Sequence, residues 1–112
     1  MVDIWDMIIE FNDEYFPNWR RGEEIFYSNA LAGEAGEFCN KIKKRYGGGI
    51  VSGTKKGKFS DYELMIELAD LFIYMELWIE SKGHDISTFA NIIVDKLNQN
   101  IKMMESNKRK RP

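Results

Sequence analysis

Residues 63–80 read ELMIELADLFIYMELWIE and form the longest strongly apolar segment of the chain. In a helix, these apolar side chains would cover almost every side, which is typical of a helix buried on most sides. Glu63, Glu67 and Asp70 interrupt the segment at steps of four and three residues, so they share one helical face. A buried carboxylate is strongly unfavourable without a partner. The segment therefore predicts a central helix whose acids need a partner.

Other helices are predicted on both sides of this segment. Ser60 followed by Glu63 forms a capping box that predicts where the central helix begins, and Gly83 stands where it ends. Apolar residues at helical spacing predict further helices over about residues 2–15, 23–46 and 85–106, with a Gly- and Lys-rich loop over 47–59. We therefore expect an all-α fold, an antiparallel four-helix bundle. So short a chain cannot cover its central helix alone, and we expect a homodimer or homotetramer formed through helix packing.

The composition is that of one globular domain. Of the 112 residues, 44% are hydrophobic and 30% are charged, which is too apolar for a disordered chain. No apolar run reaches the ~18–20 residues that a membrane span requires. We predict one helical domain over residues 1–106 and a basic, disordered tail over 107–112. Four of the 16 basic residues lie in that tail, which leaves the body acidic, so we expect no nucleic-acid partner.

The cysteine and histidine content excludes several kinds of site. One cysteine, Cys39, and one histidine, His84, leave no internal disulfide and no zinc site built from several such ligands. The acidic residues 1–10 do not resemble a secretory signal, so we expect a cytoplasmic protein without a membrane partner. We expect Cys39 to be a small, buried filler.

A second acidic pair lies on the helix predicted over residues 23–46. Glu34 and Glu37 are three residues apart, and antiparallel packing of this helix on the central one would bring four carboxylates together. Carboxylates that converge in this way suit a hard divalent cation, above all Mg²⁺, with Mn²⁺ as the alternative. Gly33 and Gly36 flank the pair, although glycine inside a helix costs ~1 kcal/mol relative to alanine. These glycines predict a close approach at the acidic site.

Two other interpretations of the acids compete with metal binding. The carboxylates could pair with nearby lysines, namely Lys41, Lys43 and Lys44. A diiron site is a further option in helical bundles, but it requires Glu-x-x-His pairs, and neither acidic pair contains histidine. Two acidic pairs on consecutive helices, one of them within apolar surface, favour the cation site.

Two motifs resemble a known family. ALAGEAGEF at residues 30–38 and ELADLFIYM at 67–75 are similar to the MazG-like, all-α nucleoside triphosphate pyrophosphohydrolases, which include dimeric dUTPases and dCTP pyrophosphatases. The resemblance covers roughly residues 19–102. It implies hydrolysis of (d)NTP to (d)NMP and pyrophosphate. It also implies that Mg²⁺ is held by the four acids of the two motifs: Glu34, Glu37, Glu67 and Asp70.

The resemblance also implies substrate-binding residues. Tyr74 matches a tyrosine near the bound nucleotide, and Lys96 with Asn100 matches a Lys-x-x-x-Asn pair that binds phosphate and sugar. Trp19 matches a tryptophan that lines the base pocket. One position departs from the pattern, because Met103 stands where the family often has an arginine that contacts phosphate.

These residues lead to a functional expectation with open alternatives. We expect a Mg²⁺-dependent nucleotide pyrophosphohydrolase for nucleotide-pool housekeeping, with Glu34 or Glu37 as the catalytic general base. Outgoing pyrophosphate would be taken by Lys96 or by other basic residues: Lys41, Arg45, Lys55, Lys56 or Lys58. One alternative is a non-enzymatic helical oligomer that acts as a binding or regulatory module. Another is an enzyme of the same fold acting on a different diphosphate-linked compound, such as phosphoribosyl-ATP.

Overall fold

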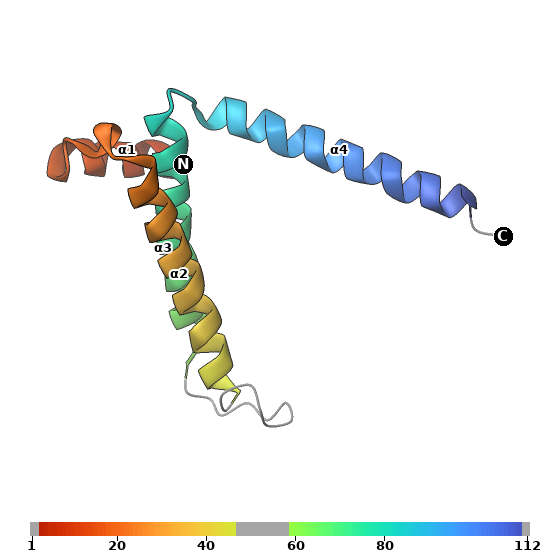
Figure 1. Ribbon diagram of the computed structural model, residues 1–112, viewed down its shortest axis with the longest axis horizontal. Coiled ribbons are helices and arrows are strands. Elements are labelled where there is room, and N and C mark those ends of the chain that lie inside the picture. The colour runs from red at the N-terminus through yellow and green to blue at the C-terminus, as the bar shows by residue number, and fades with distance from the viewer. Residues whose placement is uncertain (1–2, 47–58, 111–112) are drawn as a thin grey trace.

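The computed structural model describes residues 3–46 and 59–110, and every regular element in these ranges is a helix (Figure 1). The elements are α1 (Ile4–Tyr15), the 3-10 helix η1 (Trp19–Arg21), α2 (Glu24–Arg45), α3 (Asp61–Ser81) and α4 (Ile86–Lys110). The predicted all-α class is therefore confirmed. Most of the loop predicted over 47–59 lies outside the described residues.

The ends of the helices follow from local side-chain chemistry. The Asp3 side chain accepts hydrogen bonds from the first backbone N–H groups of α1. The Ser60 hydroxyl accepts one from the Glu63 backbone N–H at 3.1 Å, which confirms half of the capping box. Gly83 follows α3 with a φ of 81°, a left-handed conformation that glycine adopts without strain. The predicted start and end of the central helix are thus confirmed.

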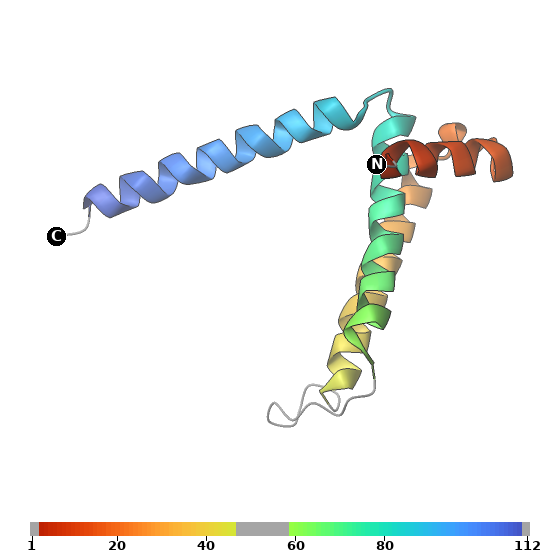
Figure 2. The ribbon, with the colours of Figure 1, turned by 180° about the vertical axis from the view of Figure 1, so that it is seen from behind.

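The helices α2 and α3 form an antiparallel hairpin, and both ribbon views show them side by side (Figures 1 and 2). An ion pair ties each end of this hairpin. Arg45 Nη2 lies 2.8 Å from Asp61 Oδ1 at one end, and Lys82 pairs with Glu24 at the other. This pairing sets the middle of α2 against the middle of α3, where the acidic motifs lie.

The largest core cluster lies where η1 and α1 meet the α2–α3 hairpin. Trp19, Tyr27 and Leu77 are buried there, and the Tyr27 hydroxyl donates a hydrogen bond to the Trp19 backbone carbonyl. Partly buried side chains from α1 and α3 pack on this cluster: Ile8, Ile9, Ile73 and Tyr74. The cluster fixes η1 and α1 on the end of the hairpin that lies near α4.

The helix α4 leaves the hairpin and runs away from it as a single helix of 25 residues (Figures 1 and 2). The radius of gyration is 18.6 Å, whereas a compact domain of this length would have about 13 Å. The predicted four-helix bundle is therefore not closed within one chain. Apolar side chains on the α4 face that would enter a bundle are exposed, including Ile93 at 44%, Leu97 at 54% and Ile101 at 56%.

The helix α4 also continues past its predicted end. It extends to Lys110, so residues 107–110 of the expected disordered tail are helical. Lys108 and Arg109 are basic residues in the last turn, where positive charge interacts favourably with the helix dipole, and no glycine or proline lies between Ile86 and Lys110 to end the helix earlier. Among the described residues, no helix is both long and apolar enough to cross a membrane.

Candidate metal centre

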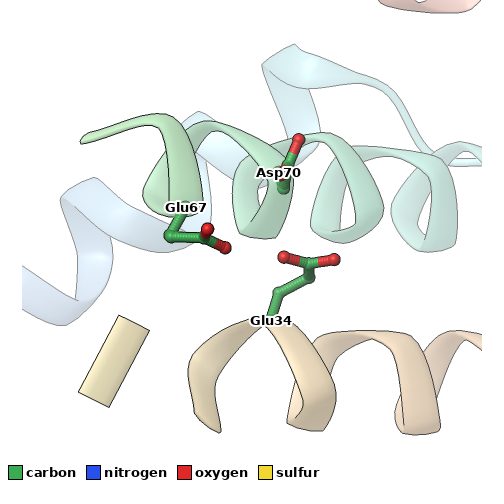
Figure 3. Close-up of side chains that lie close together, drawn as sticks. All are labelled: Glu34, Glu67 and Asp70. Carbon is green, nitrogen blue, oxygen red and sulfur yellow. The ribbon is translucent and has the colours of Figure 1, made fainter. Parts of the chain in front are cut away.

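Three of the four predicted metal ligands converge between α2 and α3. Glu34 on α2 faces α3, which carries Glu67 and Asp70 one turn apart (Figure 3). One carboxylate oxygen of each residue lies within 4.8 Å of the others. Oxygens on opposite sides of a bound Mg²⁺ are about 4 Å apart, so small side-chain rotations suffice to ligate a cation.

Burial leaves two of these carboxylates with unsatisfied oxygens. Glu67 is only 6% exposed and Glu34 is half-buried. The Oε2 atoms of both residues are buried and have no hydrogen-bond partner among residues 3–46 and 59–110. Buried carboxylate oxygens normally find a partner, and an all-carboxylate set suits Mg²⁺ or Mn²⁺. The residues therefore fit a divalent cation.

The fourth predicted ligand, Glu37, lies at the edge of this group. It is exposed and is not among the acids whose oxygens converge. Its carboxyl nevertheless interacts with Glu67 and contributes to the field at Glu34. Burial, followed by the charges of Asp70, Glu37 and Glu67, raises the pKa of Glu34 above its ordinary value. Glu34 thus takes up a proton more readily than an ordinary carboxylate.

Lys41 pairs with Glu67 inside the site. Its ammonium contacts Glu67 Oε1 and lies 5.7 Å from the centre of the Phe59 ring. The hydrogen bond from Lys41 lowers the pKa of Glu67, and the same bond raises the pKa of Lys41. The interpretation in which lysines pair with the acids is therefore correct for this one contact. Lys43 and Lys44 are exposed and form no ion pair among the described residues.

Two apolar cavities of about 480 and 550 Å³ lie where α1 meets α3, and the second borders the acidic group at Asp70. Trp19 and Tyr74 line the first cavity, and Asp70 and Tyr74 line the second. Asn12, a buried polar residue of α1, lines both. Trp19 and Tyr74, two predicted substrate-binding residues, thus border the first cavity, and Tyr74 also borders the second, which reaches Asp70.

Neighbouring polar groups fix the orientation of the Trp19 ring. Its indole N–H donates a hydrogen bond to Asp13 Oδ1 at 2.8 Å, and the Arg20 guanidinium lies 4.3 Å from the ring centre. The residue is 8% exposed, so it is part of the core as well as of the cavity wall.

Lys96 and Asn100, the other predicted substrate-binding residues, do not join the site within one chain. Both are exposed on α4, which runs away from the α2–α3 hairpin. A motif on a helix fixes the face on which its residues lie, but the packing of that helix decides what they meet.

The environment of α2 differs from the prediction at three small residues. A Cβ added to Gly33 or Gly36 would meet no atom within 4 Å, so nothing in the described chain makes the predicted close approach. Cys39 is exposed instead of buried. All three are exposed on the surface of α2 in the described structure.

A second buried acid, Glu76 on α3, was not singled out by the sequence analysis. Its side chain has no exposed area, and both carboxylate oxygens are without a hydrogen-bond partner. Burial raises the pKa of Glu76 to about 8, with further contributions from Glu80, Asp3 and Asp6. The sequence places Glu76 between apolar residues of this helix, but its burial depends on how α1 packs on α3.

The described residues thus assemble an acidic group with unsatisfied oxygens, one lysine within it, and an aromatic-lined space beside it. Such an arrangement is able to hold a divalent cation next to a flat, apolar ligand group. Comparison of the chain with protein-family models, with curated proteins and with solved structures gave no match.

Proposed function

We propose that this protein is a Mg²⁺-dependent nucleoside triphosphate pyrophosphohydrolase, which converts (d)NTP to (d)NMP and pyrophosphate. The observation that carries the proposal is the convergence of Glu34, Glu67 and Asp70, with buried and unpartnered oxygens, beside an apolar cavity. An acidic pocket repels a triphosphate unless cations lie between them, which favours metal-dependent chemistry. The proposed role is nucleotide-pool housekeeping in the cytoplasm.

In this proposal, some acids of the site bind the metal ion and one acts as the general base. Glu34, Glu67 and Asp70 would hold Mg²⁺ or Mn²⁺, and Glu37 adds a carboxylate at the edge of the group. A bound cation neutralises phosphate charge and orients a water molecule. Because its surroundings raise the pKa of Glu34, this residue takes up a proton more readily than an ordinary carboxylate. We assign the general base to Glu34, with Glu37 as the alternative.

The cavities beside the acids supply the surface for the rest of the nucleotide. Tyr74 borders both cavities and Trp19 borders the first, so their rings provide apolar contact for a base. Tyr74 is one turn from Asp70 on α3, which puts the base contact next to a metal ligand.

A second copy of the chain would complete the bundle in this proposal. On α3, Met65, Leu68 and Phe72 are 56%, 42% and 39% exposed, and the apolar face of α4 is exposed as well. Helices with such faces are stable when another helix covers them. A MazG-like bundle assembled from two or four chains would bury both surfaces, and it is the arrangement in which Lys96 and Asn100 meet a carboxylate site.

A non-enzymatic helical oligomer is the second candidate function. The long apolar face of α4 favours it, because such a face serves equally well to bind another protein helix. In this case the acids of α2 and α3 would be structural, and no nucleotide would be consumed.

Product analysis separates the two functions. The purified protein is incubated with a panel of NTPs and dNTPs, in Mg²⁺ and in EDTA, and the products are identified by chromatography. Metal-dependent release of pyrophosphate and a monophosphate supports the enzyme, and the rank order identifies the substrate. Release of inorganic phosphate indicates that a different bond is broken, and no turnover favours the binding module.

A further inference from the structure

Lys41 is the cation that the fold itself places in the carboxylate site. Of the described residues, it alone forms an ion pair with one of the three converging acids. The other ion-paired cations of the hairpin, Arg45 and Lys82, hold its two ends. Lys41 is therefore not one of the ion pairs that hold the two ends of the hairpin together. Its ion pair lies in the carboxylate site.

The ion pair between Lys41 and Glu67 is one in which a divalent cation can replace the lysine. The Glu67 side chain is 8% exposed, so a charge of opposite sign must accompany it, whereas the Lys41 side chain is 32% exposed and can withdraw toward solvent. Lys41 pairs with Oε1 of Glu67, and Oε2 is buried without a hydrogen-bond partner in the described part of the chain. One ammonium among three carboxylates leaves an excess of negative charge that a divalent cation would neutralise better.

The position of Lys41 on α2 supports the same role. It follows Glu37 by four residues and Glu34 by seven, so all three side chains leave the helix on one face. The carboxylate that Lys41 holds comes from the other helix of the hairpin. Lys41 thus bridges α2 and α3 across the space in which the acids converge.

We propose that Lys41 is the built-in counter-ion of the carboxylate site, which neutralises Glu67 when no divalent cation is bound and competes with that cation for the same carboxylate. The inference rests on the proposed metal site and deepens it. It gives Lys41 a definite effect, because the lysine stabilises the metal-free protein and weakens metal binding.

Mn²⁺ binding without nucleotide tests this inference on the full chain. Lys41→Met removes the charge and keeps the apolar stem, and Lys43→Met is the matched control, because Lys43 is exposed on the same helix. Each variant loses one positive charge. We expect Lys41→Met to bind Mn²⁺ at least about tenfold more tightly than Lys43→Met, as measured by calorimetry or by the electron paramagnetic resonance of free Mn²⁺.

Thermal unfolding supplies a second readout. Without metal, Lys41→Met should melt at a lower temperature than Lys43→Met, since Glu67 loses its counter-charge. Saturating Mn²⁺ should abolish this difference. If Lys41→Met does not fold, Lys41→Gln replaces it, because the amide still donates a hydrogen bond to Glu67 but carries no charge. The same tighter binding of Mn²⁺ is expected for Lys41→Gln.

The outcomes separate this inference from the proposed function. If the wild type and the Lys43→Met control bind Mn²⁺ but Lys41→Met binds it no more tightly, the role of Lys41 is overturned and the metal site stands. A melting deficit of Lys41→Met that persists in saturating Mn²⁺ likewise means that the ion pair is only structural. If no variant binds Mn²⁺, both the metal site and the counter-ion are overturned.

Discussion

Two glutamates of α3, Glu67 and Glu76, are both buried but have opposite electrostatic surroundings. Glu67 contacts Lys41, whose hydrogen bond lowers its pKa, so it is ionised and suited to ligate a cation. Burial raises the pKa of Glu76 to about 8, and the nearby charges of Glu80, Asp3 and Asp6 act in the same direction. At neutral pH it therefore holds a proton, which makes it a poor ligand and a source of pH-dependent stability.

Glu76 should make the folded protein less stable as the pH rises. Its pKa is about 8 in the folded protein and 4.5 when unperturbed. The folded state thus binds more protons between these values, and stability is lost as the pH increases across this window. Glu76→Gln should remove much of that slope and stabilise the protein by about 1–3 kcal/mol at pH 8, with little effect near pH 4.5.

Urea unfolding between pH 4.5 and pH 9 measures this difference. Glu10→Gln is the control, because it makes the same substitution at an exposed position on α1. The charges that face Glu76 come from Glu80 on its own helix and from Asp3 and Asp6 at the start of α1. An equal slope in Glu76→Gln and in Glu10→Gln would show that Glu76 is not the group that titrates.

At the scale of the helices, local chemistry sets the ends of the elements. The start of α3 was predicted from Ser60 and Glu63, and its end from Gly83, since caps depend on only a few neighbouring residues. The juxtaposition of Glu34 with Glu67 and Asp70 was also predicted, because two acidic pairs at helical spacing need a common partner.

The Ser60 cap provides a quantitative check on α3. Ser60→Ala removes the acceptor of the Glu63 N–H and should lower the free energy of unfolding by ~1 kcal/mol. Circular dichroism during urea unfolding measures the change, and Ser87→Ala on the exposed part of α4 is the control. Equal stability of Ser60→Ala and the wild type would mean that the cap does not determine where α3 begins.

Other features of the elements could not be predicted from a single sequence. Periodicity identifies the apolar face of α4, but it does not say which surface covers that face, and α4 extends away from the hairpin. The burial of Glu76 depends on α1 crossing α3, where the Trp5 indole N–H donates to Glu80 Oε1 at 2.6 Å. The close approach predicted at Gly33 and Gly36 failed for the same reason, since it requires a neighbour that the chain does not supply.

At the scale of the whole molecule, the extended shape explains why so much apolar surface is exposed. A chain with a radius of gyration of 18.6 Å buries little of α4, whose apolar face stays open along the helix. Exposed apolar surface of this extent is typical of an interaction face. The apolar face of α4 therefore needs a partner in solution, and we propose that a second copy of the chain covers it.

A charge on the α4 face should dissociate the assembly. Leu97→Asp places a carboxylate in the middle of the apolar face and should convert an oligomer of defined mass into a monomer, because burial of an unpaired charge is strongly unfavourable. Light scattering after size-exclusion chromatography measures the mass. Gln99→Glu, which adds the same charge on the side of α4 opposite Leu97, should leave the mass unchanged.

A monomeric wild type would contradict the proposed assembly. An oligomer that persists in Leu97→Asp would mean that a surface other than the α4 face holds the copies together.

One measurement tests most directly whether the carboxylate site is the centre of the reaction. Pyrophosphate release from nucleoside triphosphates in Mg²⁺ is compared for the wild type, Glu67→Gln and Glu10→Gln. Glu67→Gln keeps the size of the side chain but removes a buried ligand, so release should fall at least about a hundredfold while the helical circular dichroism is retained. Glu10→Gln, with the same change of charge on α1, should remain active. Wild-type activity in Glu67→Gln would show that these carboxylates do not carry the reaction.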